Sequence, residues 1–243
     1  MANLVQMGIL EKLDAFLLVD KPQGLSFSTV VKTVKRKFNL VKVGHGGSLD
    51  TLASGLMILL INDANKFADS VMSADRSYEG VMKLGESTNT HDINGEVLLK
   101  REVSEDFFER AKSAISEFKG DIFQTEPRFC AVKRDDSPLY EVVDTGEHQS
   151  FLGHVYRFSL LEQDFSQEDK RVGFSVVTSK NVLPRTLIND FGEAVGCGAT
   201  LSALRRTKIG KFSVDEAVKF EKLLEIETRD FVSCTVPLSI ALR

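Results

Sequence analysis

The sequence predicts an α+β protein with a mixed sheet. Segments with the apolar pattern of strands are interspersed along the chain with segments of helical periodicity. They lack the steady strand–helix–strand alternation that is typical of a doubly wound parallel sheet. The chain has 243 residues, of which 42% are hydrophobic and five are proline, so it can bury a sizeable core in one domain or in two lobes of one.

The N-terminal half begins with a strand–turn–helix unit. Residues 17–20 form a short apolar strand that ends at a lysine and a proline, and residues 29–38 place apolar side chains on one helical face and basic ones on the other. Residues 55–61 (GLMILLI) predict a buried strand. The remaining elements of this half are a helix over 65–74, strands over 78–84 and 96–101, and a turn at Asn94-Gly95.

The C-terminal half contains both predicted helices and predicted strands. Residues 104–118 carry apolar side chains at helical spacing before Gly120, which predicts a helix. Residues 155–165 and 171–179 predict strands joined by a charged loop, and 185–195 predict a helix. A capping box of Ser213 and Glu216 predicts a last helix that ends near residue 226.

The charge distribution says more about partners than the net charge does. A net charge of -4 argues mildly against a nucleic-acid partner, which needs phosphates to be neutralised. Basic side chains nevertheless form two clusters without acids, namely Lys32, Lys35, Arg36, Lys37 and Lys42, and Arg205, Arg206, Lys208 and Lys211. Their segregation predicts one basic face, whereas each cluster alone is also typical of a solvated surface.

Composition also bears on cellular localisation and on metal sites. No apolar run approaches the roughly 18 residues of a membrane helix, and residues 1–10 lack the features of a signal peptide, so we expect a cytoplasmic protein and no membrane partner. Cys130, Cys197 and Cys234 are far apart in the sequence, which indicates buried thiols and neither a zinc site nor a disulfide framework.

The segment VGHGGSLDTLASG (residues 43–55) is the strongest candidate for chemistry. It places the carboxylate of Asp50 among small residues, directly before the predicted buried strand. Gly44, Gly46 and Gly47 permit a ligand to approach the main chain closely. From the residues alone, an Asx-turn or a helix cap at Asp50 is the more common outcome.

This segment resembles the motif G-H-T-G-T-L-D-P-x-A-T-G of the bacterial tRNA pseudouridine-55 synthase family, in which the aspartate is catalytic. The resemblance extends, in the same order, over about residues 17 to 212. The further matching segments are VDKPQGLS (19–26), SADRSY (73–78) with LGESTNTHDING (84–95), PRFCAVK (127–133) with LYE (139–141), and SKNVLPR (179–185) with DFG (190–192) and LRR (204–206).

The resemblance implies the pseudouridine synthase fold, with a largely antiparallel central sheet flanked by helices and a central catalytic cleft. It implies that uridine is isomerised to pseudouridine in the T-loop of tRNA, at position 55, by base flipping and without a cofactor or metal. The implied partner is the T-arm of tRNA, with no obligatory protein partner, and we expect a monomer.

Three residues are implied to be catalytic by the same resemblance. Asp50 attacks the nucleotide or assists deprotonation. Arg185 pairs with Asp50, and Tyr78 stacks on the target base and takes part in a later proton transfer. Without the motifs, a surface ion pair is the favoured interpretation for Arg185, and core packing is the favoured one for Tyr78.

Other positions are implied to bind the substrate. His45 matches the residue that fills the gap left by the flipped base, and Leu204 matches one that lines the uracil pocket. Lys21 and Pro22 are expected to shape the cleft. Gly46 and Leu183 also fall on substrate-binding positions, and the expected RNA-binding residues are Lys32, Lys35, Arg36, Arg205 and Arg206.

The chain departs from the family pattern at several positions. Gly46 replaces Thr and Thr51 replaces Pro, which we expect to loosen the backbone and lower the activity. Leu183 stands where the family has Tyr, so one pocket hydrogen bond is expected to be missing. The other departures are Phe27 for Ser, Ser48 for Thr, Ser54 for Thr, Asn89 for Asp, Phe129 for Tyr, Cys130 for Ser and Asn181 for Gly.

We expect a catalytic domain over residues 1–212 and a C-terminal helix and tail over 213–243, which is too short for the appended PUA-type RNA-binding domain common in the family. Three other functions are alternatives. An RNA-folding or remodelling protein with weak catalysis is compatible with the pocket departures. A nucleotide enzyme that binds phosphate through residues 44–48 lacks the lysine of a P-loop, and an RNA-guided synthase subunit is disfavoured by the short C-terminal segment.

Overall fold

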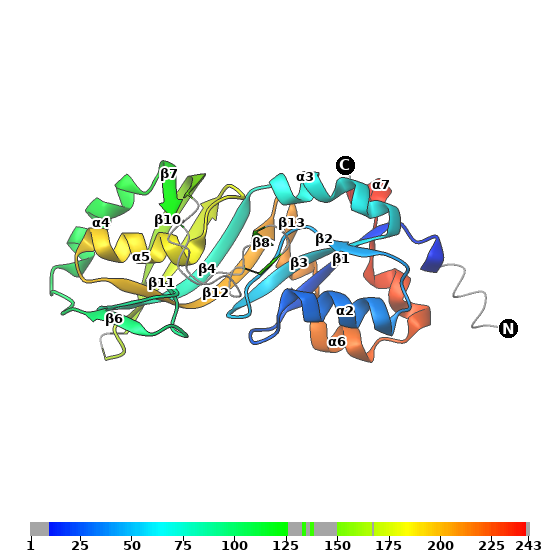
Figure 1. Cartoon of the computed structure of the whole chain (residues 1–243), viewed down its shortest axis with the longest axis horizontal. Coiled ribbons are helices and arrows are strands. Elements are labelled where there is room, and N and C mark those ends of the chain that lie inside the picture. Colours follow the sequence, from blue (N-terminus) through cyan, green and yellow to red (C-terminus); the bar gives the residue numbers. More distant parts are fainter. Residues whose placement is uncertain (1–9, 126–132, 135–136, 139–149, 167, 242–243) are drawn as a thin grey trace. The chain divides into compact units, whose positions relative to one another are not determined.

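A computed structural model describes residues 10–125, 133–134, 137–138, 150–166 and 168–241 (Figure 1). The chain forms two compact units. The first contains Met1–Arg76 and Arg205–Arg243, and the second contains Ser77–Leu204. Within the described residues, no helix is both long enough and apolar enough to span a membrane.

The sheet of the first unit is built around two apolar strands. β1 (Ala15–Lys21) and β3 (Ala53–Ile61) are antiparallel, with a register that runs from Ala15 opposite Ile61 to Lys21 opposite Gly55. The strand order is β14-β1-β3-β12, where β12 is Ala199–Ile209. β14 (Val218–Lys219) is parallel to β1, so the sheet is mixed. The remaining strands of this unit are β2 (Val43–His45), which pairs with β3, β13 (Phe212–Ser213), which pairs with β12, and β15 (Val236–Pro237), which pairs with β1.

Helix α2 (Phe27–Lys37) connects β1 to β2 and confirms the predicted basic helix. The Oγ atom of Ser26 caps it by accepting a hydrogen bond from the backbone N–H of Thr29 (3.1 Å). Val30 and Val34 are buried, whereas the last turn carries three basic residues that interact favourably with the helix dipole. Figure 1 shows α6 (Phe220–Glu225) alongside α2.

Two helix predictions in this unit need correction. The expected helix over 65–74 is a 3-10 helix, η1 (Asn62–Phe67), followed by the short helix α3 (Ala68–Ser73). The capping box of Ser213 and Glu216 is present, but it caps only a 3-10 turn, η3 (Val214–Glu216). The chain then pairs with β1 as β14 before α6 begins, because β1 offers an edge to the extended residues. The chain continues through η4 (Thr228–Cys234) and α7 (Leu238–Ala241).

The second unit has a sheet in the order β12-β4-β11-β10-β7. Its strands are β4 (Arg76–Leu84), β7 (Gly120–Thr125), β10 (Ser150–Ser166), β11 (Arg171–Thr178) and residues 199–204 of β12 (Ala199–Ile209). β10 is antiparallel to both β7 and β11. The predicted strands near 78–84, 155–165 and 171–179 are confirmed, whereas β12 was not predicted.

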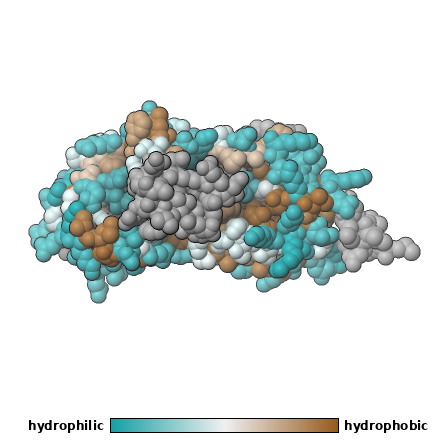
Figure 2. Space-filling view, viewed as in Figure 1, coloured by the Kyte–Doolittle hydropathy of each residue, from teal (hydrophilic) through white to brown (hydrophobic). Residues whose placement is uncertain are grey.

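Helices α4 (Phe107–Glu117) and α5 (Pro184–Val195) pack against each other in the second unit and confirm two predicted helices. Phe191 of α5 contacts the rings of Phe118 and Phe158, with ring centroids 5.9 and 5.2 Å away. Two short ribbons complete the unit, β5 (Glu86–Thr88) with β6 (Val97–Lys100), and β8 (Lys133–Arg134) with β9 (Ser137–Pro138). The apolar side chains of β6 are exposed and are visible as a brown patch on the left of Figure 2.

The observed fold class is the predicted one, α+β with a mixed sheet and flanking helices. The predicted division into a catalytic domain (1–212) and a C-terminal segment (213–243) stays a prediction. The two compact units divide the chain at other places, and the strand β12 contributes residues to both of them.

We predict that Gly55→Ala destabilises the first unit more than Gly24→Ala. Both glycines have positive φ (+105° and +87°), so each alanine introduces backbone strain of about 1 to 3 kcal/mol. At Gly55 a Cβ atom would also lie 2.3 Å from the backbone oxygen of Arg206, whereas at Gly24 it would meet no atom within 4 Å. Overpacking should add about 1 to 3 kcal/mol at Gly55. Urea unfolding measures both changes, and equal losses would contradict the close approach of β3 to β12.

Candidate active site

The loop that carries Asp50 is held by backbone hydrogen bonds along its length. The N–H of Gly46 donates to the oxygen of Ile58 (2.8 Å), and the N–H of Ala53 donates to the oxygen of Asp50 (3.1 Å). The N–H of Gly24 donates to the oxygen of Thr51 (2.8 Å), which joins the loop to the turn after β1. The side chain of Asp50 is half-buried. The loop is therefore fixed on both sides of the candidate catalytic carboxylate.

Gly46 packs closely against Val71 of α3. A Cβ atom at Gly46 would lie 2.2 Å from Cγ1 of Val71 and 3.5 Å from Cβ of Ile58. Val71 of α3 thus occupies the space that a threonine side chain would need. The departure from the family pattern at Gly46 is matched by packing, and the loosening expected there stays a prediction.

Lys21 ends β1 with its side chain fully buried. Its Nζ atom donates to the backbone oxygens of Pro22 (2.9 Å) and Leu25 (2.7 Å). Burial lowers the pKa of Lys21 to about 8, the negative charge of Asp50 raises it, and the positive charge of Arg206 lowers it. Lys21, Asp50 and Arg206 therefore lie within electrostatic range of one another. Both Lys21 and Pro22 serve here to shape the turn beside the Asp50 loop.

Arg206 corrects one prediction. It was expected to contact RNA, but its side chain is buried, with 2% of its surface exposed. Its guanidinium donates to the backbone oxygens of Leu56, Ser48 and Gly47. A guanidinium buried on backbone carbonyls is not presented to a phosphate, and Arg206 instead joins the Asp50 loop to β3.

His45 lies at the end of β2 and is oriented by two neighbours. The N–H of Gly47 donates to its Nδ1 atom (3.2 Å). The ring of Phe27 packs against the imidazole edge to face, with centroids 5.1 Å apart. The departure from Ser to Phe27 therefore supplies a wall for His45. Its role in filling the gap of a flipped base stays a prediction.

The other predicted RNA-binding residues differ in exposure. Lys32, Lys35 and Arg36 are exposed on α2. Arg205 is partly exposed, and its two terminal nitrogens donate to both carboxylate oxygens of Asp20 (2.9 and 2.8 Å). Its charge is thus paired with a carboxylate within the first unit.

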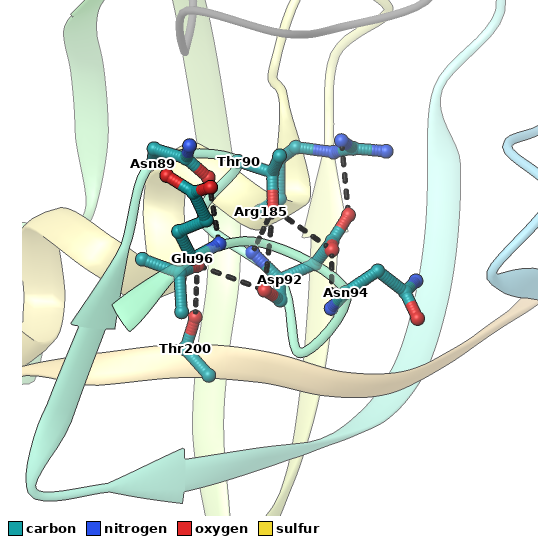
Figure 3. Close-up of polar contacts among 8 residues, drawn as sticks. Asn89, Thr90, Asp92, Asn94, Glu96, Arg185 and Thr200 are labelled. Carbon is teal, nitrogen blue, oxygen red and sulfur yellow. Dashed lines mark hydrogen bonds and ion pairs between the residues drawn. The ribbon is translucent and has the colours of Figure 1, made fainter. Parts of the chain in front are cut away.

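Arg185 lies in the first turn of α5, after Pro184 at the start of the helix. Its Nη1 atom lies 3.0 Å from Oδ2 of Asp92, and their side chains are 12% and 6% exposed. The other carboxylate oxygen, Oδ1, accepts hydrogen bonds from Oγ1 of Thr90 (3.0 Å) and from the backbone N–H of Asn94 (2.9 Å) (Figure 3). Hydrogen bonds within its own turn thus orient the carboxylate of Asp92 that pairs with Arg185.

The turn that holds Asp92 is anchored to β12. Oγ1 of Thr88 donates to the backbone oxygen of Asp92 (2.8 Å) and shares a hydrogen bond with Thr200 (3.0 Å). His91 has a positive φ of 59° and lies beside the ion pair. Burial, and then the positive charge of Arg185, lower the pKa of His91 to about 4 against the opposing effect of Asp92. His91 is therefore neutral at neutral pH and does not compete with Arg185 for Asp92.

The remaining predicted site residues lie in the second unit. Tyr78 in β4 and Leu204 in β12 are both buried. Leu183 is held through its backbone, because its N–H donates to Oε1 of Gln124 (2.8 Å) and its oxygen accepts from Nε2 of the same side chain (3.2 Å). The buried amide of Gln124 thus fixes the chain just before Arg185.

The predicted site residues divide between the two units. Those in the first unit are Lys21, Pro22, His45, Gly46 and Asp50, and those in the second are Tyr78, Leu183, Arg185 and Leu204. The pairing of Asp50 with Arg185 joins residues of different units and stays a prediction. The matching segments at 127–132 and 139–141, with Phe129 and Cys130, lie outside the described residues.

Sequence reasoning missed two residues that position the site. Asp92 belongs to a segment that was matched to the family, but no role was assigned to it. Its signal is the spacing Thr90-x-Asp92 before Asn94-Gly95, which is typical of an Asx-type turn. Gln124 had no sequence signal, because its value depends on contacts with a distant segment. Among the described residues, no group of three His, Cys, Asp or Glu side chains could hold a metal ion.

We predict that Asp92→Asn lowers the free energy of unfolding by about 3 to 5 kcal/mol, because Arg185 would lose the carboxylate that pairs with it in a buried position. As a control, Lys66→Met removes the exposed ion pair with Asp63 and should cost at most about 1 kcal/mol. Denaturant unfolding at neutral pH measures both. A loss for Asp92→Asn no larger than for the control would show that the buried pair does not stabilise the second unit.

Comparisons with known proteins agree with the motifs. The family model described as "TruB family pseudouridylate synthase (N terminal domain)" matches residues 35–182, and "tRNA pseudouridylate synthase B C-terminal domain" matches residues 185–233. A tRNA pseudouridine synthase B of Burkholderia pseudomallei (strain 668) is 42% identical over 212 residues, which cover 87% of this chain and 69% of the relative. One of Pseudomonas putida is 38% identical over 220 residues, covering 88% and 70%.

A solved structure, "Crystal Structure of a Cbf5-Nop10-Gar1 Complex", contains a chain that is 27% identical, with a TM-score of 0.70. The match covers 93% of this chain, which spans only 61% of that one. A chain in "Structure of H/ACA RNP bound to a substrate RNA containing 2'-deoxyuridine" is 24% identical with a TM-score of 0.69, covers 97% and 62%, and shows the shared fold. Together, the matched motifs, the family models and the relatives show that this chain belongs to the TruB family of pseudouridylate synthases.

Proposed function

We propose that this chain isomerises uridine to pseudouridine in the T-loop of tRNA, at position 55, without a cofactor. The reaction detaches uracil from its ribose, rotates it and rejoins it through carbon. It requires a carboxylate near the bond between sugar and base. The observation that carries the proposal is the loop of Asp50, which is fixed by backbone hydrogen bonds beside the buried cations Lys21 and Arg206 in a member of this family.

Asp50 is proposed to attack the nucleotide or to assist its deprotonation. Lys21 shares an electrostatic interaction with it inside the first unit. Arg185 is proposed as a second cation for Asp50. Its support is that Asp92 orients its guanidinium at the start of α5. Tyr78 is proposed to stack on the target base and to take part in proton transfer.

The substrate must present an unstacked uridine, which costs a few kcal/mol in a folded loop. His45, oriented by Phe27 and Gly47, is proposed to fill the space that the base leaves. The exposed Lys32, Lys35 and Arg36 of α2 are proposed to contact phosphates. Arg205, which is partly exposed and paired with Asp20, is proposed as a further phosphate contact. Leu204, Leu183 and Gly46 are proposed to line the pocket.

We further propose that the chain acts on tRNA as a monomer in the cytoplasm, without an obligatory protein or guide RNA. The alternative is an RNA-folding or remodelling protein that binds tRNA with weak catalysis. This alternative is favoured by Leu183, which stands at the position of a family tyrosine. Its hydrogen bonds with Gln124 are made by its backbone and not by its side chain. A purified protein assayed alone distinguishes these functions.

We predict that the purified chain converts one uridine of an unmodified tRNA transcript, in the T-loop, when pseudouridine is mapped at nucleotide resolution. Asp50→Asn should lower the conversion rate by at least about 1,000-fold, as removal of a catalytic nucleophile or base does. It should leave tRNA binding unchanged. The control Asp63→Asn alters an exposed carboxylate that pairs with Lys66 and should convert at the parent rate.

Two outcomes would overturn this proposal. A parent protein that binds tRNA but forms no pseudouridine would favour the remodelling function. Equal conversion by Asp50→Asn and the parent would remove the carboxylate from the reaction.

A further inference from the structure

We propose that Arg206 is a positioning residue for Asp50, which holds the backbone of the 47–50 segment in the geometry that the reaction needs. This inference rests on the proposed function. It replaces the RNA contact that the sequence suggested for Arg206 with a role inside the protein.

The first support is the way in which the guanidinium connects two segments. Nε of Arg206 donates to the oxygen of Leu56 in β3 (2.8 Å), and Nη1 donates to the oxygen of Ser48 (2.8 Å). Nη2 reaches the oxygen of Gly47 at 3.4 Å. One planar group thus contacts carbonyls on both sides of Asp50, so a shift of the loop would break at least one of its charge-assisted hydrogen bonds.

The second support is the close packing of β3 against Arg206. Gly55 lies in β3 with a φ of +105°, and a Cβ atom there would lie 2.3 Å from the oxygen and 2.8 Å from the nitrogen of Arg206. On its other side, Gly55 is opposite Lys21 in the register of β1 and β3. Lys21 and Arg206 therefore flank a residue without a side chain, which permits the backbone of β12 to approach.

The third support is electrostatic. The buried charged side chains of the first unit, within the residues that the structure describes, are Lys21, Arg76 and Arg206, and all three are positive. Nη2 of Arg76 lies near Gly47, since it would be 3.2 Å from a Cβ atom at that position. A buried charge needs hydrogen bonds and an opposite charge. The half-buried Asp50, which interacts electrostatically with Lys21, supplies negative charge beside this group.

The alternative role, a phosphate contact, predicts different consequences of substitution. A residue that binds phosphate contributes to affinity and to its salt dependence, and its loss lowers the salt slope by about 1. A residue that positions Asp50 contributes to the rate after binding. Arg205 offers a control for the loop geometry alone, because it is the preceding residue and is bound to Asp20 outside the loop. As a proposed phosphate contact, it also shows what the loss of such a contact does to binding.

The experiment compares Arg206→Gln, Arg206→Lys and Arg205→Gln in single-turnover conversion of tRNA and in tRNA binding at several salt concentrations. For Arg206→Gln we expect a rate about 10- to 100-fold lower, because misplacing a reacting group by about 1 Å has an effect of this size. We expect the Kd and its salt slope to stay at the parent values. Arg206→Lys keeps the charge but cannot donate to three carbonyls in one plane, so it should restore only part of the rate.

Amide hydrogen exchange provides a readout that does not depend on activity. The N–H of Ala53 donates to the oxygen of Asp50, so its exchange reports on the loop. We expect faster exchange at Ala53 in Arg206→Gln and parent exchange in Arg205→Gln. Should Arg206→Gln fail to fold, Arg206→Lys carries the same comparison.

Three results would overturn the inference. The first is parent exchange at Ala53 in both Arg206 variants, and the second is a parent rate in Arg206→Lys. The third is a weaker Kd with a reduced salt slope and an unchanged rate in Arg206→Gln. A parent protein that forms no pseudouridine would instead refute the proposed function, and the exchange at Ala53 would still decide whether Arg206 positions the loop.

Discussion

The burial of positive charge beside the Asp50 loop is the constraint on which the rest of the candidate site depends. Lys21 and Arg206 are removed from water, so each must find acceptors within the protein. They find them in the backbone oxygens of the turn after β1 and of the 47–56 segment. The same carbonyls define the path of both turns. The hydrogen bonds that the two cations need therefore also fix the shape of the loop. The carboxylate of Asp50 then has a position and an electrostatic environment that the first unit itself provides.

The second unit orients its cation differently. Arg185 is paired with a carboxylate, and Asp92 is itself oriented by Thr90, Asn94 and the backbone of its turn. A charged pair with little exposure is favourable only when its remaining hydrogen-bonding positions are satisfied, and this turn satisfies those of Asp92. The result is a guanidinium fixed at the start of α5. Each unit thus uses local hydrogen bonds to fix one of the two groups of the proposed reaction, Asp50 through the backbone of its loop and Arg185 through Asp92.

The predictable parts of the fold are those with a strong apolar period. Strands β1 and β3 and helices α2, α4 and α5 were predicted because their buried faces repeat at strand or helix spacing. Strand β12 was not predicted, since it carries two arginines and one of them, Arg206, is buried against the usual tendency of its residue type. The helix expected after Ser213 was wrong because a capping box indicates where a helix begins, while pairing with β1 decided how it continued.

The candidate site also has a part that the sequence predicts and a part that it does not. Glycines around an aspartate mark the Asp50 loop in the sequence, but which cations surround it depends on contacts between distant segments. The most direct test of the charge coupling is the pKa of Lys21, measured by NMR in the parent and in Asp50→Asn. We predict a pKa near 8 in the parent and a lower one in Asp50→Asn, because burial lowers it and the charge of Asp50 raises it. A pKa near 10.5 in the parent, or the same value in both proteins, would contradict the account.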